Sequence, residues 1–235
     1  RSTLFPYTTL FRSLFMRGIT RLCHFTKSSN LSHIVDAGEI RSVTQLEHEL
    51  EGFRPTDTQR RDGHPDRICC TIEYPNTWYL DKVRKEDLNF PDWVFITIDP
   101  WPLWHGETKF SPYNAARANG GVIRPGLVGY QAMFAPTVSG QRDFRRLPDH
   151  PPWWPTDDQA EVLIASPIPL SSVRSVIVRD RAQAQREVAR ASHNHQDHLL
   201  PPLVVAPTLF DKFGLSDSVR RGRRPPELTA SRLAE

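Results

Sequence analysis

A glutamate opens an apolar segment late in the chain, where its position suits chemistry on a sugar. Glu161 begins the run EVLIA, two residues after Gln159. In an extended segment residues i and i+2 project to the same side, so the two side chains are expected to face one site. A placed carboxylate can orient a ribose hydroxyl and stabilise the positive charge that develops as nicotinamide leaves C1′, while the amide positions an acceptor. The alternative interpretation is a solvated glutamate at a strand edge.

Three polar residues near the start of the chain could serve the same chemistry. His24 and Thr26 alternate along a β-type segment and share a face, and Asn30 follows soon after. Their side chains could hydrogen-bond ribose hydroxyls and an amide. Asn114 is a further candidate, because the alanines that follow it let the backbone approach closely. The competing interpretations are a structural histidine in the first case and a helix cap in the second.

Other chemistries find little support in the residue pattern. His193, His195 and His198 form a cluster without further ligands at metal-binding spacing, which favours a solvated polar segment and no metal site. Cys69 and Cys70 lie in an apolar strand, where cysteine is usually inert packing. Gly120-Gly121 lacks the Lys and Ser/Thr of a phosphate-binding loop, so ATP chemistry is not expected.

The elements that must position these residues are short strands joined by long loops. Apolar and β-branched runs predict strands at 19–26, 67–74, 93–98, 160–165 and 173–178. Helices are expected from the Ser28–Asn30 cap to Gly38, over 77–85 and over 181–191. The segments 44–66, 99–112 and 122–152 are expected to be mostly loop. This order lacks a βαβ rhythm and therefore predicts an α+β fold.

The chain divides into three expected parts. Residues 1–15 resemble a translated sequencing-adapter remnant and are expected to be a non-native leader before Met16. Residues 16–192 hold the predicted domain. Residues 193–235 lose pattern and carry a basic run, so an irregular, largely disordered tail is expected.

Composition limits where the protein works. Three cysteines, two of them adjacent, argue against a disulfide framework and favour a reducing cytoplasm. No apolar run approaches the roughly 18 residues of a membrane-spanning helix, so no membrane partner is expected. The net charge of +3 permits an acidic partner without requiring one.

Basic and aromatic residues interleave in the loops before Glu161. The basic set is Arg117, Arg124, Arg142, Arg145 and Arg146, and the aromatic set is Trp101, Trp104, Tyr130, Trp153 and Trp154. Such a mixture suits a single nucleic-acid strand, because charge follows the backbone and rings stack on bases. Arg145 and Trp153, with Asn114 and Gln159, are the predicted substrate contacts. The alternative is that the tryptophans pack the loops onto the sheet.

Four segments in order resemble the DarT family of ADP-ribosyltransferases. They are LCHFTKSSNLSHIVDAGEI, IEYPNTWYLDKVR, WVFITIDPWPLWHGETKFSPYNAA and QAEVLIASPIPLSSV. The resemblance runs from about residue 17 to residue 180, and the His24-x-Thr26 and Gln159-x-Glu161 pairs carry most of it. It implies a split β-sheet core with short helices and long loops, and NAD bound between two small sheets as co-substrate, with no metal.

The resemblance also implies roles for individual residues. Glu161 is the implied catalytic glutamate, His24 and Thr26 the implied NAD contacts, and Asn30 a neighbour in the same pocket. Better-known members carry an arginine where this chain has Asn76. Arg84 is expected to reach the pyrophosphate instead, because its guanidinium offers a bidentate fork, although it could also be a solvated charge.

The expected function is transfer of ADP-ribose from NAD to a nucleobase of single-stranded DNA, as a toxin or anti-phage effector. The family resemblance implies a macrodomain-type antitoxin as partner. Two alternatives stay open: transfer to RNA or protein, and a catalytically silent nucleic-acid-binding module, which the Asn76 departure keeps in view.

Overall fold

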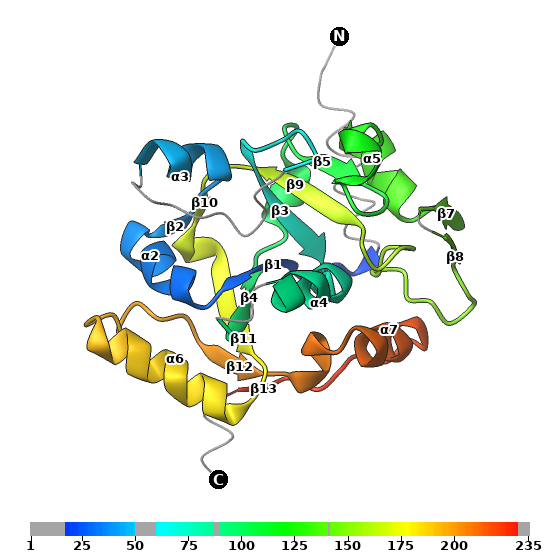
Figure 1. Ribbon diagram of the computed structural model, residues 1–235. Coiled ribbons are helices and arrows are strands. Elements are labelled where there is room, and N and C mark those ends of the chain that lie inside the picture. The colour runs from blue at the N-terminus through cyan, green and yellow to red at the C-terminus, as the bar shows by residue number, and fades with distance from the viewer. Residues whose placement is uncertain (1–16, 50–59, 87–89, 141, 230–235) are drawn as a thin grey trace.

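One large sheet organises the molecule. The computed structural model describes residues 17–49, 60–86, 90–140 and 142–229. Nine strands form the sheet in the order β13-β12-β11-β4-β1-β3-β9-β5-β6 (Figure 1). The expected α+β class with a mixture of strands, short helices and loops is confirmed. No helix among the described residues is long and apolar enough to span a bilayer.

The first half of the sheet is built around a fully buried strand. β4 (Trp93–Ile98) pairs antiparallel along its whole length with β1 (Leu22–Lys27), and on its other side with β11 (Val173–Val178). β12 (Leu203–Val205) runs parallel to β11, and β13 (Leu228–Thr229) ends the sheet. Every residue of β4 is buried, as its continuous apolar run predicts.

The second half carries the strand that begins at Glu161. β3 (Arg67–Ile72) pairs antiparallel with β9 (Glu161–Ala165), and β9 pairs with β5 (Lys109–Ser111). β6 (Arg124–Pro125) forms the edge. Two two-stranded ribbons lie outside the large sheet. The first joins β2 (Glu39–Ile40) to β10 (Ile168–Pro169), and the second joins β7 (Thr137–Ser139) to β8 (Asp143–Arg145).

The two halves meet at a short junction. β1 and β3 pair only where Leu22 and Cys23 lie opposite Ile72 and Thr71. Beyond these pairs the strands have no shared ladder, so the rest of β1 faces an opening. The sheet is thus continuous in topology but split between β1 and β3, where the family resemblance implied two small sheets.

Helices cover both faces of the sheet (Figure 1). The described α-helices are α2 (Ser29–Ala37), α3 (Val43–Glu49), α4 (Thr77–Glu86), α5 (Gly126–Met133), α6 (Arg181–His193) and α7 (Lys212–Arg220). Alternate residues of β4 enter different apolar clusters, Ile96 on one side and Phe95 on the other. Four 3₁₀ turns fill the connections: η1 (Trp101–Trp104), η2 (Arg117–Gly120), η3 (Leu170–Ser172) and η4 (Pro207–Phe210).

The strand predictions at 93–98 and 173–178 agree with the structure residue for residue. Gly38 ends α2 with φ +69°, and its N–H bonds the Val35 carbonyl, as expected of a C-cap glycine. The expectation of loop over 122–152 is wrong in part, because α5, β6, β7 and β8 lie there. The sequence did not predict α5, because this short helix packs on β5 and no local sequence pattern predicts that contact.

The prediction of a largely disordered tail is wrong for residues 193–229. This segment adds β12 and β13 to the sheet and packs α7 against α4 and η4. Its basic residues pair with distant carboxylates, as Arg220 does with Asp158 and Arg224 with Glu73. These partners lie far away in the sequence, so the segment read in isolation looks unpatterned. The predicted leader 1–15 lies outside the described residues.

The pair between Arg224 and Glu73 yields a test of this docking. Glu73 is fully buried with φ +63°, and Arg224 bonds its carboxylate over 2.9 Å while stacking 4.1 Å from the Trp153 ring centroid. The substitution leaves the buried Glu73 carboxylate with its hydrogen bonds from Thr20 and without its Arg224 partner, so we expect Arg224→Ala to lower the free energy of unfolding by about 2 kcal/mol. Urea denaturation measures the change. Arg223→Ala, which removes an exposed pair with Asp217, is the matched control and should cost under about 0.5 kcal/mol. Equal midpoints for the two variants would contradict the structural role of Arg224.

Candidate active site

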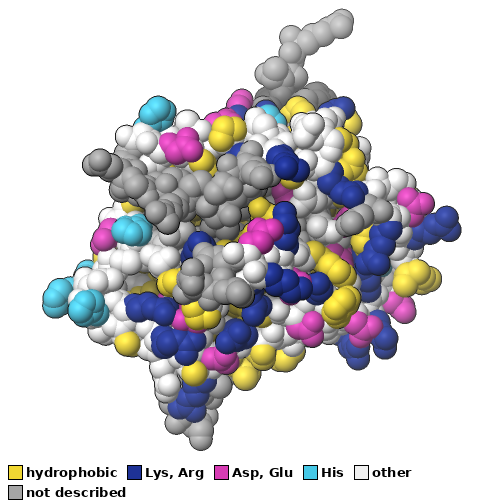
Figure 2. Space-filling model, in the orientation of Figure 1, with side chains coloured by type: hydrophobic (Ala, Val, Ile, Leu, Met, Phe, Trp, Pro, Cys, Tyr) yellow, Lys and Arg dark blue, Asp and Glu magenta, His cyan; other side chains and the backbone are white. Residues whose placement is uncertain are grey.

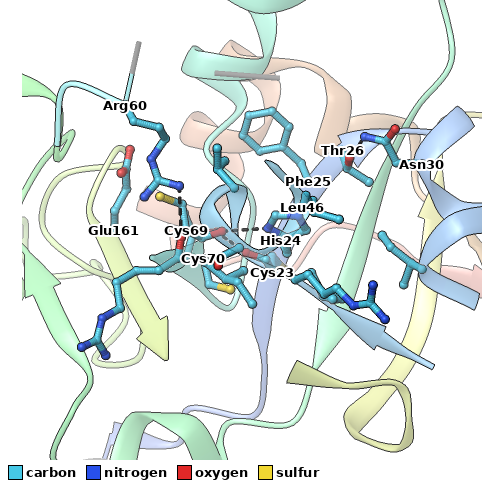
Figure 3. A pocket seen from close by; sticks show the side chains of 18 of the residues that line it. Cys23, His24, Phe25, Thr26, Asn30, Leu46, Arg60, Cys69, Cys70 and Glu161 are labelled. Atoms are coloured by element: carbon cyan, nitrogen blue, oxygen red, sulfur yellow. Dashed lines mark hydrogen bonds between the residues drawn. The ribbon is translucent and has the colours of Figure 1, made fainter. Parts of the chain in front are cut away.

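A cavity of about 460 Å³ opens where β1 and β3 separate. Its walls come from β1, α2, β3, the start of α3 and α4, and the loop after β5. Five residues singled out from the sequence line it together: His24, Thr26, Asn30, Asn114 and Glu161. Figure 3 shows Glu161 on one wall and Thr26 with Asn30 at the opposite end. Residues distant in the chain therefore converge on one space, as the sequence predicts.

His24 is held in a defined tautomer by β3, the strand from which β1 separates after Cys23. Its Nδ1 lies 2.9 Å from the carbonyl oxygen of Cys69 on β3. A carbonyl only accepts, so Nδ1 carries the proton, and Nε2 of the neutral ring is an acceptor. Burial lowers the pKa of His24, opposed by the Cys69 carbonyl and reinforced by the positive charge of Arg60. At neutral pH the ring can therefore accept a hydrogen bond from a ribose hydroxyl or an amide.

Thr26 on β1 and Asn30 in the first turn of α2 form a second polar position in the cavity. The Asn30 amide donates to Thr26 Oγ1 over 2.9 Å. This bond occupies a lone pair of the hydroxyl and leaves the Thr26 O–H able to donate. It also fixes the Asn30 side chain with its amide oxygen as an acceptor. The pair can thus present one donor and one acceptor to a ligand.

Two asparagine side chains hold Glu161. Asn76 and Asn114 each donate from Nδ2 to Glu161 Oε1 over 3.3 Å. Backbone N–H groups show which amide atom is the oxygen in each asparagine. Asn76 Oδ1 accepts a hydrogen bond from Tyr79 N at 3.0 Å, and Asn114 Oδ1 accepts one from Ala116 N at 3.1 Å. A backbone N–H needs an oxygen acceptor, so each NH₂ must face the carboxylate. Glu161 is only 9% exposed and is thus aimed by two fixed donors.

Arg60 brings a cation to the same wall, and sequence reasoning missed it. Figure 3 shows its guanidinium beside Glu161. Asp62 pairs with Arg60 at 2.8 Å, and the carbonyls of Arg67 and His64 accept further hydrogen bonds from it. Gly120 permits this arrangement, because a Cβ there would lie 2.2 Å from the Asp62 carbonyl oxygen and its φ is +76°. No periodic pattern marks Arg60, which follows the polar segment 50–59.

Four predicted site residues lie away from the cavity lining. Arg84 is on α4, which reaches the cavity through Asn76 and Tyr79 at its other end. Gln159 lies in a turn closed by Ala160 N and the Asp157 carbonyl, so the extended geometry expected to align it with Glu161 is absent. Trp153 packs on Tyr74 and Trp154, with ring centroids 5.8 and 6.4 Å away. Arg145 ends β8, exposed.

The cysteines near the cavity offer no nucleophile. Burial raises the pKa of the Cys23, Cys69 and Cys70 thiols, which keeps them protonated at neutral pH. All three are free thiols. Across the described residues, no group of three or more His, Cys, Asp or Glu side chains is arranged to hold a metal ion.

Comparison with known proteins agrees with this geometry. The family model described as "ssDNA thymidine ADP-ribosyltransferase, DarT" matches residues 23–211. The chain belongs to the DarT family. This confirms the family resemblance and, with it, the expected enzyme class of ADP-ribosyltransferase. Solved relatives were determined in complex with NAD+ and carba-NAD+. The sequence matches no curated protein.

Solved DarT structures share the fold at low sequence identity. A Thermus sp. 2.9 DarT in complex with NAD+ is 13% identical, covers 82% of this chain and 98% of its own, and has a TM-score of 0.56. The same protein with ADP-ribosylated ssDNA is 12% identical, with coverage of 82% and 96% and a TM-score of 0.55. A Thermosipho africanus DarTG in complex with ADP-ribose is 13% identical, with a TM-score of 0.55. The match covers 81% of this chain but only 51% of DarTG, so the chain spans about half of its length.

The two amides on Glu161 give a test specific to positioning. Asn76→Asp and Asn114→Asp keep the oxygen that accepts the backbone N–H but replace the donor facing Glu161 with a second carboxylate oxygen. We expect kcat for ADP-ribosyl transfer to fall about 10- to 100-fold, with the KM for NAD changed less than threefold, because the carboxylate loses its alignment. Steady-state kinetics separates the two constants.

Asn194→Asp is the control for the amide test, since the Asn194 amide donates to Ser32 outside the cavity. It should leave kcat unchanged. Asp is as good a helix N-cap as Asn, so Asn76→Asp should still fold. Full kcat in both cavity variants would show that the amides do not position Glu161.

The lowered pKa of His24 predicts a pH dependence of stability. The unfolded chain takes up a proton at this residue near pH 6.5, whereas the folded chain takes it up only at lower pH. Stability from His24 is therefore complete above about pH 6.5 and is lost as the pH falls below it. Thermal melts at pH 7.5 and 5 should show a smaller loss for His24→Asn than for the unaltered chain. His198→Asn, at an exposed position, should not reduce the loss.

Proposed function

We propose that this chain transfers ADP-ribose from NAD to the thymine base of single-stranded DNA. The proposal rests mainly on one observation: Glu161, aimed by two amides, shares a cavity with His24, Thr26 and Asn30. The family description names thymidine in ssDNA, and a Thermus relative was solved with ADP-ribosylated ssDNA. Both support the choice of acceptor.

NAD binding is assigned to the β1 side of the cavity. His24 Nε2 accepts from a ribose hydroxyl, and Thr26 and Asn30 provide a donor and an acceptor for the remaining polar groups. Arg60, in place of Arg84, is the cation suited to the pyrophosphate, because it lines the cavity and Arg84 does not. The Asp62 carboxylate holds the guanidinium in position beforehand.

The reaction breaks the C1′–N bond to nicotinamide and forms a new C1′–N bond to the base. Nicotinamide leaves with the bonding electron pair as a neutral molecule, and the sugar becomes cationic. The Glu161 carboxylate stabilises that charge. In thymidine one ring nitrogen is already bonded to the deoxyribose, so the nitrogen that carries a proton is the nucleophile. Glu161 accepts this proton as the new bond forms. NAD and thymidine thus give nicotinamide, the ADP-ribosylated base and one proton.

The same relatives support a proposal for the biological setting. The Thermosipho chain is a DarTG, and the antitoxin that we propose as partner is a macrodomain-type hydrolase that removes the modification. The chain would then act as a toxin or anti-phage effector on DNA in the cytoplasm. Co-expression with a macrodomain reading frame, if one lies next to this gene, should relieve growth inhibition.

Mass spectrometry of oligonucleotides tests the function directly. Incubation with NAD and thymidine-containing single strands should add the mass of one ADP-ribose, whereas strands lacking thymidine should stay unmodified. Glu161→Gln should reduce transfer at least about 100-fold, because the stabilising charge is lost. Glu86→Gln, at an exposed residue of α4, is the control and should be fully active.

Acceptor swaps separate the remaining alternatives. Modification of RNA or of a protein in place of DNA would reassign the acceptor while keeping the enzyme class. Salt-sensitive DNA binding without nicotinamide release would instead indicate a silent binding module. Full transfer by Glu161→Gln would refute the mechanism.

A further inference from the structure

Cations and aromatic rings alternate across a surface formed by α4, α7 and the β7–β8 hairpin. We name this surface the cation–aromatic ribbon; its members are Trp78, Arg142, Phe144, Lys212, Phe213 and Arg220. Figure 2 shows Lys and Arg side chains interleaved with hydrophobic ones on the side where α7 and the hairpin lie. The three parts of the ribbon come from segments that are distant in the sequence and lie side by side only in the folded chain.

Ring and cation distances define the ribbon. The guanidinium carbon of Arg142 lies 5.0 Å from the Phe144 centroid and 5.6 Å from that of Trp78. Lys212 Nζ follows, 5.0 Å from Trp78 and 5.2 Å from Phe213. Trp78 and Phe213 meet edge to face at 5.3 Å. All these separations are in the range of cation–π and aromatic attraction.

Core packing does not explain the aromatic end of the ribbon. α7 already buries Leu215 and Val219 as its core face. Phe213, at the start of the same helix, is 66% exposed and belongs to neither large core cluster. A large ring left in solvent beside cations is a typical platform for a nucleobase.

The cations of the ribbon differ in how far they are neutralised. Lys212 pairs with Asp81 at 2.6 Å, and Arg220 pairs with Asp158. Arg142 has no ion pair within the part of the chain that the structure describes; its guanidinium rests on two rings and is exposed. A stacked guanidinium keeps its in-plane N–H groups for a phosphate.

The ribbon lies next to the residues that aim Glu161. Trp78 is two positions after Asn76, and its neighbour Tyr79 lines the cavity. On the other side, a Cβ on Gly140 of the hairpin would lie 3.3 Å from Tyr113, the residue before Asn114. The segments that carry the two amides contacting Glu161 thus lie beside α4 and the hairpin, which carry parts of the ribbon.

We propose that the cation–aromatic ribbon binds the single strand that flanks the target base. A base next to the target stacks on Phe213, with Trp78 bracing that ring, and Arg142 pairs with a backbone phosphate. This inference rests on the proposed function, since it concerns the acceptor of the same site. Alternation of rings and cations suits a single strand, which exposes both base faces and phosphates.

Fluorescence anisotropy with a labelled thymidine-containing oligonucleotide tests the ribbon without any reaction. Phe213→Ala and Arg142→Ala should each weaken binding about 5- to 20-fold, as expected for one lost stack or phosphate contact. Arg142→Ala should also lower the slope of log Kd against log salt by about one ion. Phe213→Tyr should bind like the unaltered chain, because it retains the ring.

Two variants at α6 serve as matched controls. Val188→Ala removes an exposed apolar side chain, and Arg179→Ala removes a half-buried cation just before the helix. Both should leave oligonucleotide binding unchanged. In the transfer assay, the ribbon variants should raise the KM for DNA while the KM for NAD stays constant.

The outcomes separate the ribbon from the proposed function. If both ribbon variants transfer ADP-ribose to DNA with unchanged DNA affinity and an unchanged KM for DNA, the DNA-binding role of the ribbon is refuted and the proposed function stands. Ribbon-dependent binding without any transfer overturns the proposed function alone. Ribbon variants that bind the oligonucleotide normally but lose binding to the antitoxin would reassign the surface to a protein partner and overturn the inference.

Discussion

The separation of β1 from β3 is the constraint on which the site depends. Two residue pairs hold the strands together, and then the ladder stops. A strand leaving its partner exposes carbonyls that need donors, and His24 supplies one to Cys69. The histidine therefore replaces part of the missing ladder. Its tautomer and its orientation follow from that single bond, whereas its neutral state follows from burial, which lowers the pKa of the ring.

Glu161 is governed by the opposite arrangement, in which strand pairing continues up to its own residue. β9 pairs with β3 and β5, and Glu161 lies opposite Ser111. The backbone is thus rigid where the carboxylate emerges, and the two asparagines fix the side chain. Asn76 is also the N-cap of α4, so the amide aimed at Glu161 is oriented by the helix itself. Asn76, where the family resemblance implies an arginine, thus supplies a neutral donor to the carboxylate.

Local pattern was enough to predict the longer strands β1, β3, β4, β9 and β11 and the site residues that they carry. β4 is buried along its whole length and β11 is rich in valine and isoleucine, and His24, Thr26 and Glu161 belong to strands with clear signals, so their positions could be foreseen. Arg60 could not, because its position depends on Asp62 and on the close approach of Gly120 from a distant loop. Gln159 was misplaced because a turn at Asp157 precedes β9 and breaks the alternation.

The C-terminal segment shows why charge composition alone misleads about order. A basic run with few apolar residues reads as solvated, yet Arg224 neutralises a carboxylate that burial would otherwise strand. Arg21, just before β1, similarly pairs with Glu227, and Glu73 just after β3 is the partner of Arg224, so two ion pairs of opposite direction join the C-terminal segment to the sheet. This docking carries α7 against α4, the helix whose first turn touches the active site. The segment that appears least structured in sequence therefore completes the surface beside Glu161.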